Sequence, residues 1–271
     1  MNFAFLDDVG IPVSAALIAA GAVAVQPFGN IYALVARSDG QSLRRLNARA
    51  GRHPGCPGSV VTVWRHIPTV FDWSALPDGL ESETVMEIID TLLAQGPFGF
   101  RGPASQRMPA HLTSVAAGVR TARLIAPGYR CASNRLIEAT LAVTGDRLLA
   151  VAATCAHAGA GAPDAAPHWR ADTIAVAFAD APGMVLVRHP DETATEGAHP
   201  QAAAAATVLG FHRLGRPDAQ GRPTLLLERQ GSYPVEALRK TLDAWGFGLD
   251  VTAARRRPTL RSHGEGAAAA A

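Results

Sequence analysis

The sequence predicts an α/β fold built on a twisted mixed sheet with flanking helices. Three observations support this prediction. Apolar residues recur with helical spacing in some segments and form β-branched runs typical of strands in others. The two kinds of segment alternate in the first half of the chain, and strand-like segments dominate the second half. The chain has 271 residues, 48% of them hydrophobic, which is enough for a sizeable buried core.

In the first half the predicted elements are, in order, a helix at 12–20, strands at 22–26 and 31–36, a helix at 41–50, a strand at 59–64 and a helix at 84–94. Pro27 ends the first strand, because proline fixes its own φ and pushes the preceding residue toward extended geometry. Gly29 and Asn30 then supply turn conformations. We expect this loop to present backbone groups to a ligand. Thr84 and Glu87 have the spacing of a capping box.

In the second half the predicted elements are, in order, a strand at 120–126, a helix at 133–145, strands at 148–154, 173–178, 184–189, 207–211 and 224–229, and a helix at 235–245. Ser133 and Asn134 are expected to cap the helix that Gly145 closes. No internal repeat or linker is evident, which favours a single domain over residues 1–250. Residues 251–271 combine a basic run with low complexity, so we expect a flexible tail.

Charge and cysteine content narrow the class of protein. The formal charge is +2, and Lys240 is the only lysine among 25 basic residues. An arginine-rich chain suits an anionic ligand or nucleic acid, although coding bias is the alternative. Three widely spaced cysteines without a CxxC pair favour reduced thiols in a cytoplasmic protein. The apolar run at 9–25 lacks a basic flank and contains proline and glycine, so we expect no signal peptide and no membrane span. The histidines lack the spacing of a metal motif.

The loop at 27–34 and several later segments resemble, in the same order, the motifs of the Sua5/YrdC/YciO family. The family loop has the form P-T-x-T-x-Y-G-L, and "PFGNIYAL" keeps its proline, tyrosine and leucine. The later segments resemble the K-x-R-P, P-G-P-x-T, R-V-P, S-x-N, S-T-V and R-x-G motifs, in "RLNARAGRHPG", "QGPFGF", "RTARLIAPGY", "LLAVAATCAHAGAG", "AATVL" and "TLLLERQGS". The match extends over roughly residues 12–240.

The resemblance implies a YrdC-like domain in which a twisted sheet surrounds a basic cavity. Active members of the family condense L-threonine, bicarbonate and ATP into threonylcarbamoyl-adenylate for tRNA modification, and double-stranded RNA binding is attributed to the family. The resemblance therefore implies ATP, with or without Mg²⁺, and a nucleotide or small amino-acid-like substrate. RNA is a further implied partner.

The resemblance also assigns roles to residues. Arg52 is expected to hold phosphate, and Thr154 to hydrogen-bond the nucleotide. Asn30 and Tyr32 are expected to contact the acyl substrate.

Phe28 is expected to line the same cavity, with packing in the core as the alternative. Three further arginines are expected to converge with Arg52 on the ligand, with solvated strand ends as the alternative: Arg120, Arg123 and Arg229.

The chain departs from the family at several polar positions. Ala50 stands in place of the lysine of K-x-R, and Ala156 in place of the asparagine of S-x-N. Further family threonines, a glycine and a serine are replaced by Phe28, Asn30, Gly99, Ala33 and Ala206. Two hypotheses follow. The chain is a carbamoyl-adenylate synthase-like enzyme with altered substrate or reduced catalysis, or it is a non-catalytic module that binds double-stranded RNA or a nucleotide.

Overall fold

The strands of the chain join in one mixed sheet. The computed structural model describes residues 1–29, 31–153, 169–193, 205–252 and 254–256. Within them 13 strands follow the order β1-β9-β2-β3-β8-β4-β7-β5-β10-β11-β12, with β6 paired to β7 and β13 to β11. The strands are β1 (Asn2–Phe5), β2 (Val23–Phe28), β3 (Ile31–Arg37), β4 (Ser59–Val61), β5 (Phe98–Pro103), β6 (Thr113–Ala116), β7 (Val119–Ala126), β8 (Leu149–Ala153), β9 (Met184–Arg188), β10 (Thr207–Gly210), β11 (Thr224–Gln230), β12 (Gly248–Asp250) and β13 (Arg255–Arg256).

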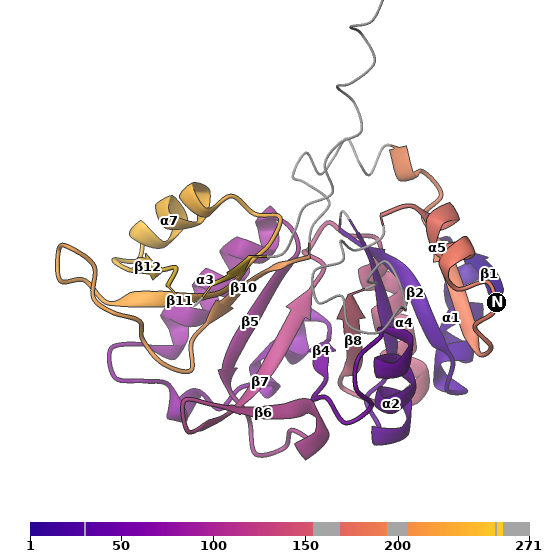
Figure 1. Cartoon of the computed structure of the whole chain (residues 1–271), viewed down its shortest axis with the longest axis horizontal. Coiled ribbons are helices and arrows are strands. Elements are labelled where there is room, and N and C mark those ends of the chain that lie inside the picture. The colour runs from indigo at the N-terminus through magenta and orange to yellow at the C-terminus, as the bar shows by residue number, and fades with distance from the viewer. Residues whose placement is uncertain (30, 154–168, 194–204, 253, 257–271) are drawn as a thin grey trace, which may run out of the picture.

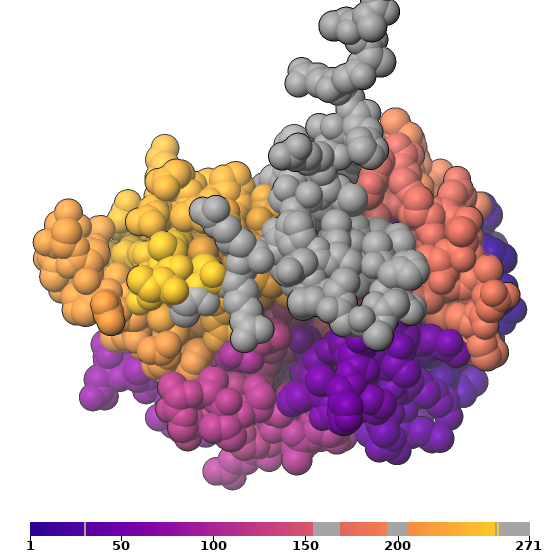
Figure 2. Space-filling model, viewed as in Figure 1, coloured from indigo at the N-terminus to yellow at the C-terminus, as the bar shows by residue number. Residues whose placement is uncertain are grey.

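Helices flank this sheet, as the sequence predicts. They are α1 (Gly10–Ala19), α2 (Gly40–Arg49), α3 (Ser82–Gln95), α4 (Ser133–Thr144), α5 (Ala171–Ala177) and α7 (Val235–Asp243), with short 3₁₀ helices η1 (Trp64–Thr69), η2 (Trp73–Ala75) and η3 (Ala110–Leu112). Figure 1 shows α3 and α7 beside the strands of the C-terminal half, and α1, α4 and α5 near the N-terminal strands. In the space-filling view the orange and yellow residues after 205 lie at one end of the molecule, and residues 169–193 lie at the other (Figure 2).

The core lies on both faces of the sheet. Phe98 and Phe100 of β5 belong to the largest cluster, which also takes the buried residues of α2, α3 and α7. A second cluster joins Phe28 to α4 through Ile137 and Leu141. A third lies between α1 and the strands β1, β2 and β9. Successive residues of a strand point to opposite faces, so β3 contributes to the first and second clusters and β9 to the first and third.

The strand predicted at 173–178 is wrong, because residues 171–177 form the helix α5. α5 buries Ala171 and Ile174, three residues apart, while Val176 is exposed. That spacing places the two buried side chains on one helical face, against β9. A short apolar run rich in β-branched residues does not distinguish a strand from a buried helix by its pattern alone.

Two predicted helix caps are also wrong. The N-cap of α3 is Glu81 and makes no side-chain capping bond, so Thr84 and Glu87 lie inside the helix. At α4 the N-cap is Ala132, and Asn134 donates to the carbonyl oxygen of Gly128 at 2.8 Å. Asparagine competes for local backbone groups, and here it binds the preceding loop.

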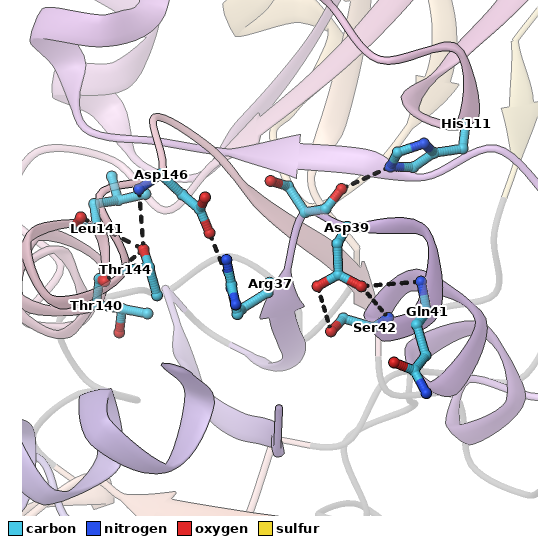
Figure 3. A network of polar contacts seen from close by, with 10 residues as sticks. Arg37, Asp39, Gln41, Ser42, His111, Thr140, Leu141, Thr144 and Asp146 are labelled. Atoms are coloured by element: carbon cyan, nitrogen blue, oxygen red, sulfur yellow. Dashed lines mark hydrogen bonds and ion pairs between the residues drawn. The ribbon is translucent and has the colours of Figure 1, made fainter. Parts of the chain in front are cut away.

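Polar contacts fix the end of β3 to its neighbours (Figure 3). Asp39 caps α2 by accepting from the backbone N–H groups of Gln41 and Ser42, at 3.0 and 2.9 Å. Burial raises the pKa of Asp39, but the bonds from Ser42 and Gln41 outweigh it and leave the pKa below its usual value. Arg37 pairs with Asp146 at 3.1 Å, which joins β3 to the turn after α4. The helix and the strand before it are thus held in place by charge-assisted bonds.

No helix in the described part of the chain is long and apolar enough to cross a membrane. Most of the tail predicted at 251–271 lies outside the described residues.

Candidate functional site

The loop between β2 and β3 places Phe28 in the core. Phe28 is 1% exposed and packs in the second cluster beneath α4, which is the core packing that the sequence left as the alternative to a ligand contact. Gly29 has φ +64°, and a Cβ there would lie 2.7 Å from Cγ of Pro97. Glycine is therefore required both by the backbone conformation and by the close approach of Pro97. Asn30 lies outside the described residues.

Tyr32 joins β3 to the segment after β9. Its hydroxyl donates to Oε1 of Glu192 at 2.5 Å and accepts from the backbone N–H of His189 at 3.2 Å. Burial raises the pKa of Tyr32, and the bond to Glu192 raises it further. The hydroxyl therefore stays protonated at physiological pH and acts as a structural donor.

Arg52 stabilises the loop between α2 and β4. Its guanidinium donates to the carbonyl oxygen of Pro57 at 2.8 Å. Its backbone N–H donates to the carbonyl oxygen of Asn47, also at 2.8 Å. Asn47 in turn donates to the carbonyl oxygens of Pro54 and Cys56. The phosphate contact expected of Arg52 stays a prediction. Thr154 and Ala156 lie outside the described residues.

Arg120 belongs to a different part of the surface. Its guanidinium donates to the carbonyl oxygens of Ser105 and Met108, and so stabilises the loop after β5. The expected convergence of Arg120 with Arg123 and Arg229 on a ligand stays a prediction.

A part-buried ionic cluster joins β7 and β5 to β11, across the intervening strand β10. Glu228 accepts from Arg101 at 3.0 Å and lies 4.0 Å from Nη2 of Arg123. The side chains of Glu228 and Arg101 are only 13% and 18% exposed. His212 has its Nδ1 3.7 Å from Glu228. The cluster therefore combines two guanidinium groups with one carboxylate.

The histidine of this cluster is neutral at physiological pH. Burial lowers the pKa of His212; Glu228 opposes this, and the charges of Arg101 and Arg213 reinforce it. The Nδ1 of His212 and the Nε of Arg101 are buried and make no hydrogen bond within the described part of the chain. Unpaired buried polar atoms are costly unless another group satisfies them.

A shift in strand pairing brings Glu228 into this cluster. Val208 pairs with Arg229, and Leu209 with Leu227, so the register omits Glu228. An extra residue of this kind redirects side chains and is common beside functional sites. Arg229 donates through Nε and Nη2 to the carbonyl oxygen of Ala206, at 2.9 and 2.7 Å.

Apolar side chains occupy the family's polar positions on the same face of the sheet. A Cβ at Gly99 would lie 2.6 Å from Cδ1 of Ile125 and 2.8 Å from Cγ2 of Val208. Gly99 stands where the family motif P-G-P-x-T has its threonine. When the R-V-P motif is placed with its proline at Pro127, Ile125 takes the position of the arginine. On the same face of β7 the next arginine is Arg123, two residues before Ile125, where it pairs with Arg101 of β5.

The closing motifs of the resemblance have structural roles. Thr207 accepts from the backbone N–H groups of Gly231 and Tyr233, both at 3.2 Å. A Cβ at Gly231 would lie 2.0 Å from the carbonyl oxygen of Ala205, so no other residue fits there. These contacts join β10 to β11 and fix the strand that carries Glu228.

The sequence reasoning missed Arg101, Glu228 and His212. The alternation in "FGFRGP" was the available signal, because two phenylalanines on one face of a strand place the intervening Gly99 and Arg101 on the other. Among the described residues no three His, Cys, Asp or Glu side chains gather in a way that could hold a metal ion.

Comparison with known proteins rests on structure alone, since no family model and no curated protein sequence matches the chain. Sua5 from P. abyssi, solved with L-threonine, is similar with a TM-score of 0.63 and 15% identity over 92% of this chain. A hypothetical protein from Streptococcus mutans gives 0.66 and 11% identity, covering 95% of this chain and 98% of its own. HypF in a phosphate- and nucleotide-bound form gives 0.54 and 13% identity, over 82% of this chain and 29% of its own.

This chain covers 61% of the Sua5 chain, so Sua5 is considerably longer. At such low sequence identities the likeness concerns the fold. The sheet order, the flanking helices and these structural neighbours, among them E. coli YciO, agree: the chain has the fold of the Sua5/YrdC/YciO family.

Proposed function

We propose that the chain binds a nucleotide or another phosphate-bearing ligand on the face of the sheet that carries Arg101, Arg123 and Glu228. The observation that carries this proposal is the pairing of two part-buried arginines with a single carboxylate. A guanidinium presents its donors in a planar fork that matches phosphate oxygens. An anion at this face would accept hydrogen bonds from Arg101 and Arg123 in competition with the Glu228 carboxylate.

The structural neighbours support this class of ligand. One of them was solved with L-threonine and another with phosphate and nucleotide. We infer that the present chain uses ATP in a carbamoyl-adenylate synthase-like reaction with a changed substrate or with reduced turnover. In such a reaction a carbamate oxygen attacks the α-phosphorus of ATP and pyrophosphate leaves.

Reduced turnover with threonine follows from the positions that have lost their polar groups. Ala50 occupies the place of the family's lysine, and Gly99 and Ile125 form an apolar contact where the family has a hydroxyl and an arginine. Fixed cations that neutralise charge in the transition state are often the largest catalytic contribution, and losing one such group typically costs about 100- to 1,000-fold in rate. Arg101 and Arg123 supply positive charge, but from different positions on the strands.

The second candidate is a binding module without turnover, which retains the arginine-bearing face for a nucleotide or for double-stranded RNA. The measurement that separates the two is ATP-dependent release of pyrophosphate in the presence of bicarbonate, tested across amino acids. Release with any amino acid supports the enzyme. Binding without release supports the module.

Calorimetry with ATP, AMP and pyrophosphate tests the site itself. We expect binding by the wild type, and we expect Arg123→Ala to weaken it by about 1.5–3 kcal/mol, the range for hydrogen bonds to charged groups. Arg52→Ala tests the second expected phosphate ligand in the same way. The matched control is Arg239→Ala, which removes an exposed helical arginine that pairs with the exposed Glu236. Equal binding by the Arg123 and Arg239 variants would contradict the proposed site.

A further inference from the structure

A pocket lies beyond the C-terminal ends of β4 and β7, between α3 and α4. Its volume is ≈ 540 Å³. Pockets that hold small molecules are typically about 300–1,000 Å³. Apolar side chains such as Leu93 and Ile67 line part of it, together with a small number of polar and aromatic residues. None of Arg101, Arg123 and Glu228 lines this pocket, so it is separate from the proposed anion site.

Trp64 presents a large apolar ring at this pocket. It is 68% exposed, and its indole N–H makes no hydrogen bond within the described part of the chain. Two other tryptophans differ in this respect, because Trp73 donates to the carbonyl oxygen of Pro68 and Trp245 donates to Glu87. An uncovered indole beside a pocket offers both a stacking surface and a free donor.

Tyr129, a second aromatic residue that lines the pocket, is held in place by several hydrogen bonds. Its hydroxyl donates to Oδ1 of Asp90 at 2.6 Å, and its backbone N–H donates to the carbonyl oxygen of Leu93 at 3.0 Å. Burial raises the pKa of Tyr129, with Asp90 adding to the effect, so the hydroxyl remains the donor. The preceding Gly128 has φ +85° and approaches Gly96 so closely that a Cβ would lie 2.6 Å from its carbonyl oxygen. A ligand would therefore meet a rim that is already ordered, which lowers the entropic cost of binding.

The charged groups at the rim favour a ligand that donates hydrogen bonds. Asp90 accepts from Tyr129 through Oδ1, and Glu138 accepts from Arg65 through Oε1 at 2.6 Å. The second oxygen of each carboxylate has no partner among the described residues. Two carboxylates and one guanidinium line the pocket, so the local charge disfavours a phosphate and favours N–H groups.

We propose that this pocket binds a planar, nitrogen-rich heterocycle with neighbouring N–H donors, such as a purine base, which stacks on Trp64 and donates to Asp90 or Glu138. Guanine fits this chemistry well, because its N1–H and N2–H groups lie side by side and match a carboxylate. The stacking surface accepts any flat base, whereas the carboxylates select for adjacent donors.

Uncharged nucleosides test this proposal without engaging the arginine-bearing face. Guanosine, inosine, adenosine and uridine are titrated into the full chain, and the indole N–H signals of the tryptophans are followed by NMR. We expect guanosine to bind most tightly and to shift the Trp64 signal. Inosine, which lacks the 2-amino group, should bind more weakly.

Variants of exposed rim residues locate the contacts. Trp64→Ala should weaken guanosine binding by at least about fivefold, the low end of the range for base stacking. Asp90→Asn or Glu138→Gln should reduce the preference for guanosine over inosine, while Trp73→Phe should leave both affinities unchanged. The proposal is overturned if no nucleoside binds, if uridine binds as tightly as guanosine, or if Trp64→Ala binds guanosine as the wild type does.

Discussion

Replacing Glu228 with glutamine should change stability and anion binding in opposite directions. Glu228 lies 3.0 Å from Arg101 and 4.0 Å from Arg123, and it is 13% exposed. Removing one partner of a buried ion pair costs about 3–5 kcal/mol. Glutamine keeps a carbonyl acceptor for Arg101, and the Arg123 side chain is 34% exposed, so we expect a loss of about 2–3 kcal/mol in the free energy of unfolding.

The same substitution removes the negative charge of Glu228 from the proposed site. Pyrophosphate should therefore bind Glu228→Gln more tightly than the wild type. A ligand that binds only the folded state at about 100 times its Kd raises the free energy of unfolding by about 2.7 kcal/mol. We expect saturating pyrophosphate to offset most of the destabilisation in the variant.

Urea unfolding with and without pyrophosphate measures both effects. Glu236→Gln is the control, because Glu236 is 88% exposed in its 3.7 Å pair with Arg239 and should contribute little to stability. If pyrophosphate stabilises neither the wild type nor Glu228→Gln, the cluster is a structural ion pair and the reasoning is refuted.

Three further predictions concern turnover and pH. Threonine-dependent pyrophosphate release should be at least about 100-fold slower than in an active Sua5, because Ala50 replaces a fixed cation; comparable turnover would contradict this. Asp39→Ala should lower the free energy of unfolding by about 1 kcal/mol in denaturant titrations, with Gln41→Ala close to wild type. Since the folded-state pKa of Asp39 is lowered, its contribution is present above about pH 4 and is lost as pH falls through that pKa; a pH-independent difference would be evidence against it. His212 also has a lowered pKa, so its contribution is present above about pH 6.5 and declines as pH falls below it. His212→Gln should flatten the stability profile between about pH 7 and 5, and an unchanged profile would show that another group titrates there.

Much of the fold could be predicted from the sequence, because its elements follow local rules. The helix at 133–145 matches α4, and Gly145 has the left-handed conformation expected of a closing glycine. The strands at 31–36, 184–189 and 224–229 match β3, β9 and β11 to within a residue or two. The order of weak motifs also indicated the correct fold, although several of the matched residues have structural roles.

The candidate site was harder to predict, because it depends on pairing between distant strands. Arg101 and Glu228 are far apart in sequence, and Glu228 joins the cluster only where the register between β10 and β11 shifts. Neither relation is visible in a local pattern. Phe28 differs, because a local motif did suggest a ligand contact for it. Its ring instead packs in the apolar cluster beneath α4.

A structure of the chain soaked with ATP or pyrophosphate tests the central claim most directly. The proposal predicts a phosphate group whose oxygens accept hydrogen bonds from Arg101 or Arg123. The Glu228 carboxylate is then turned toward whichever of these two arginines does not bind the phosphate. A phosphate bound elsewhere, with the pair of Arg101 and Glu228 unchanged, would contradict it.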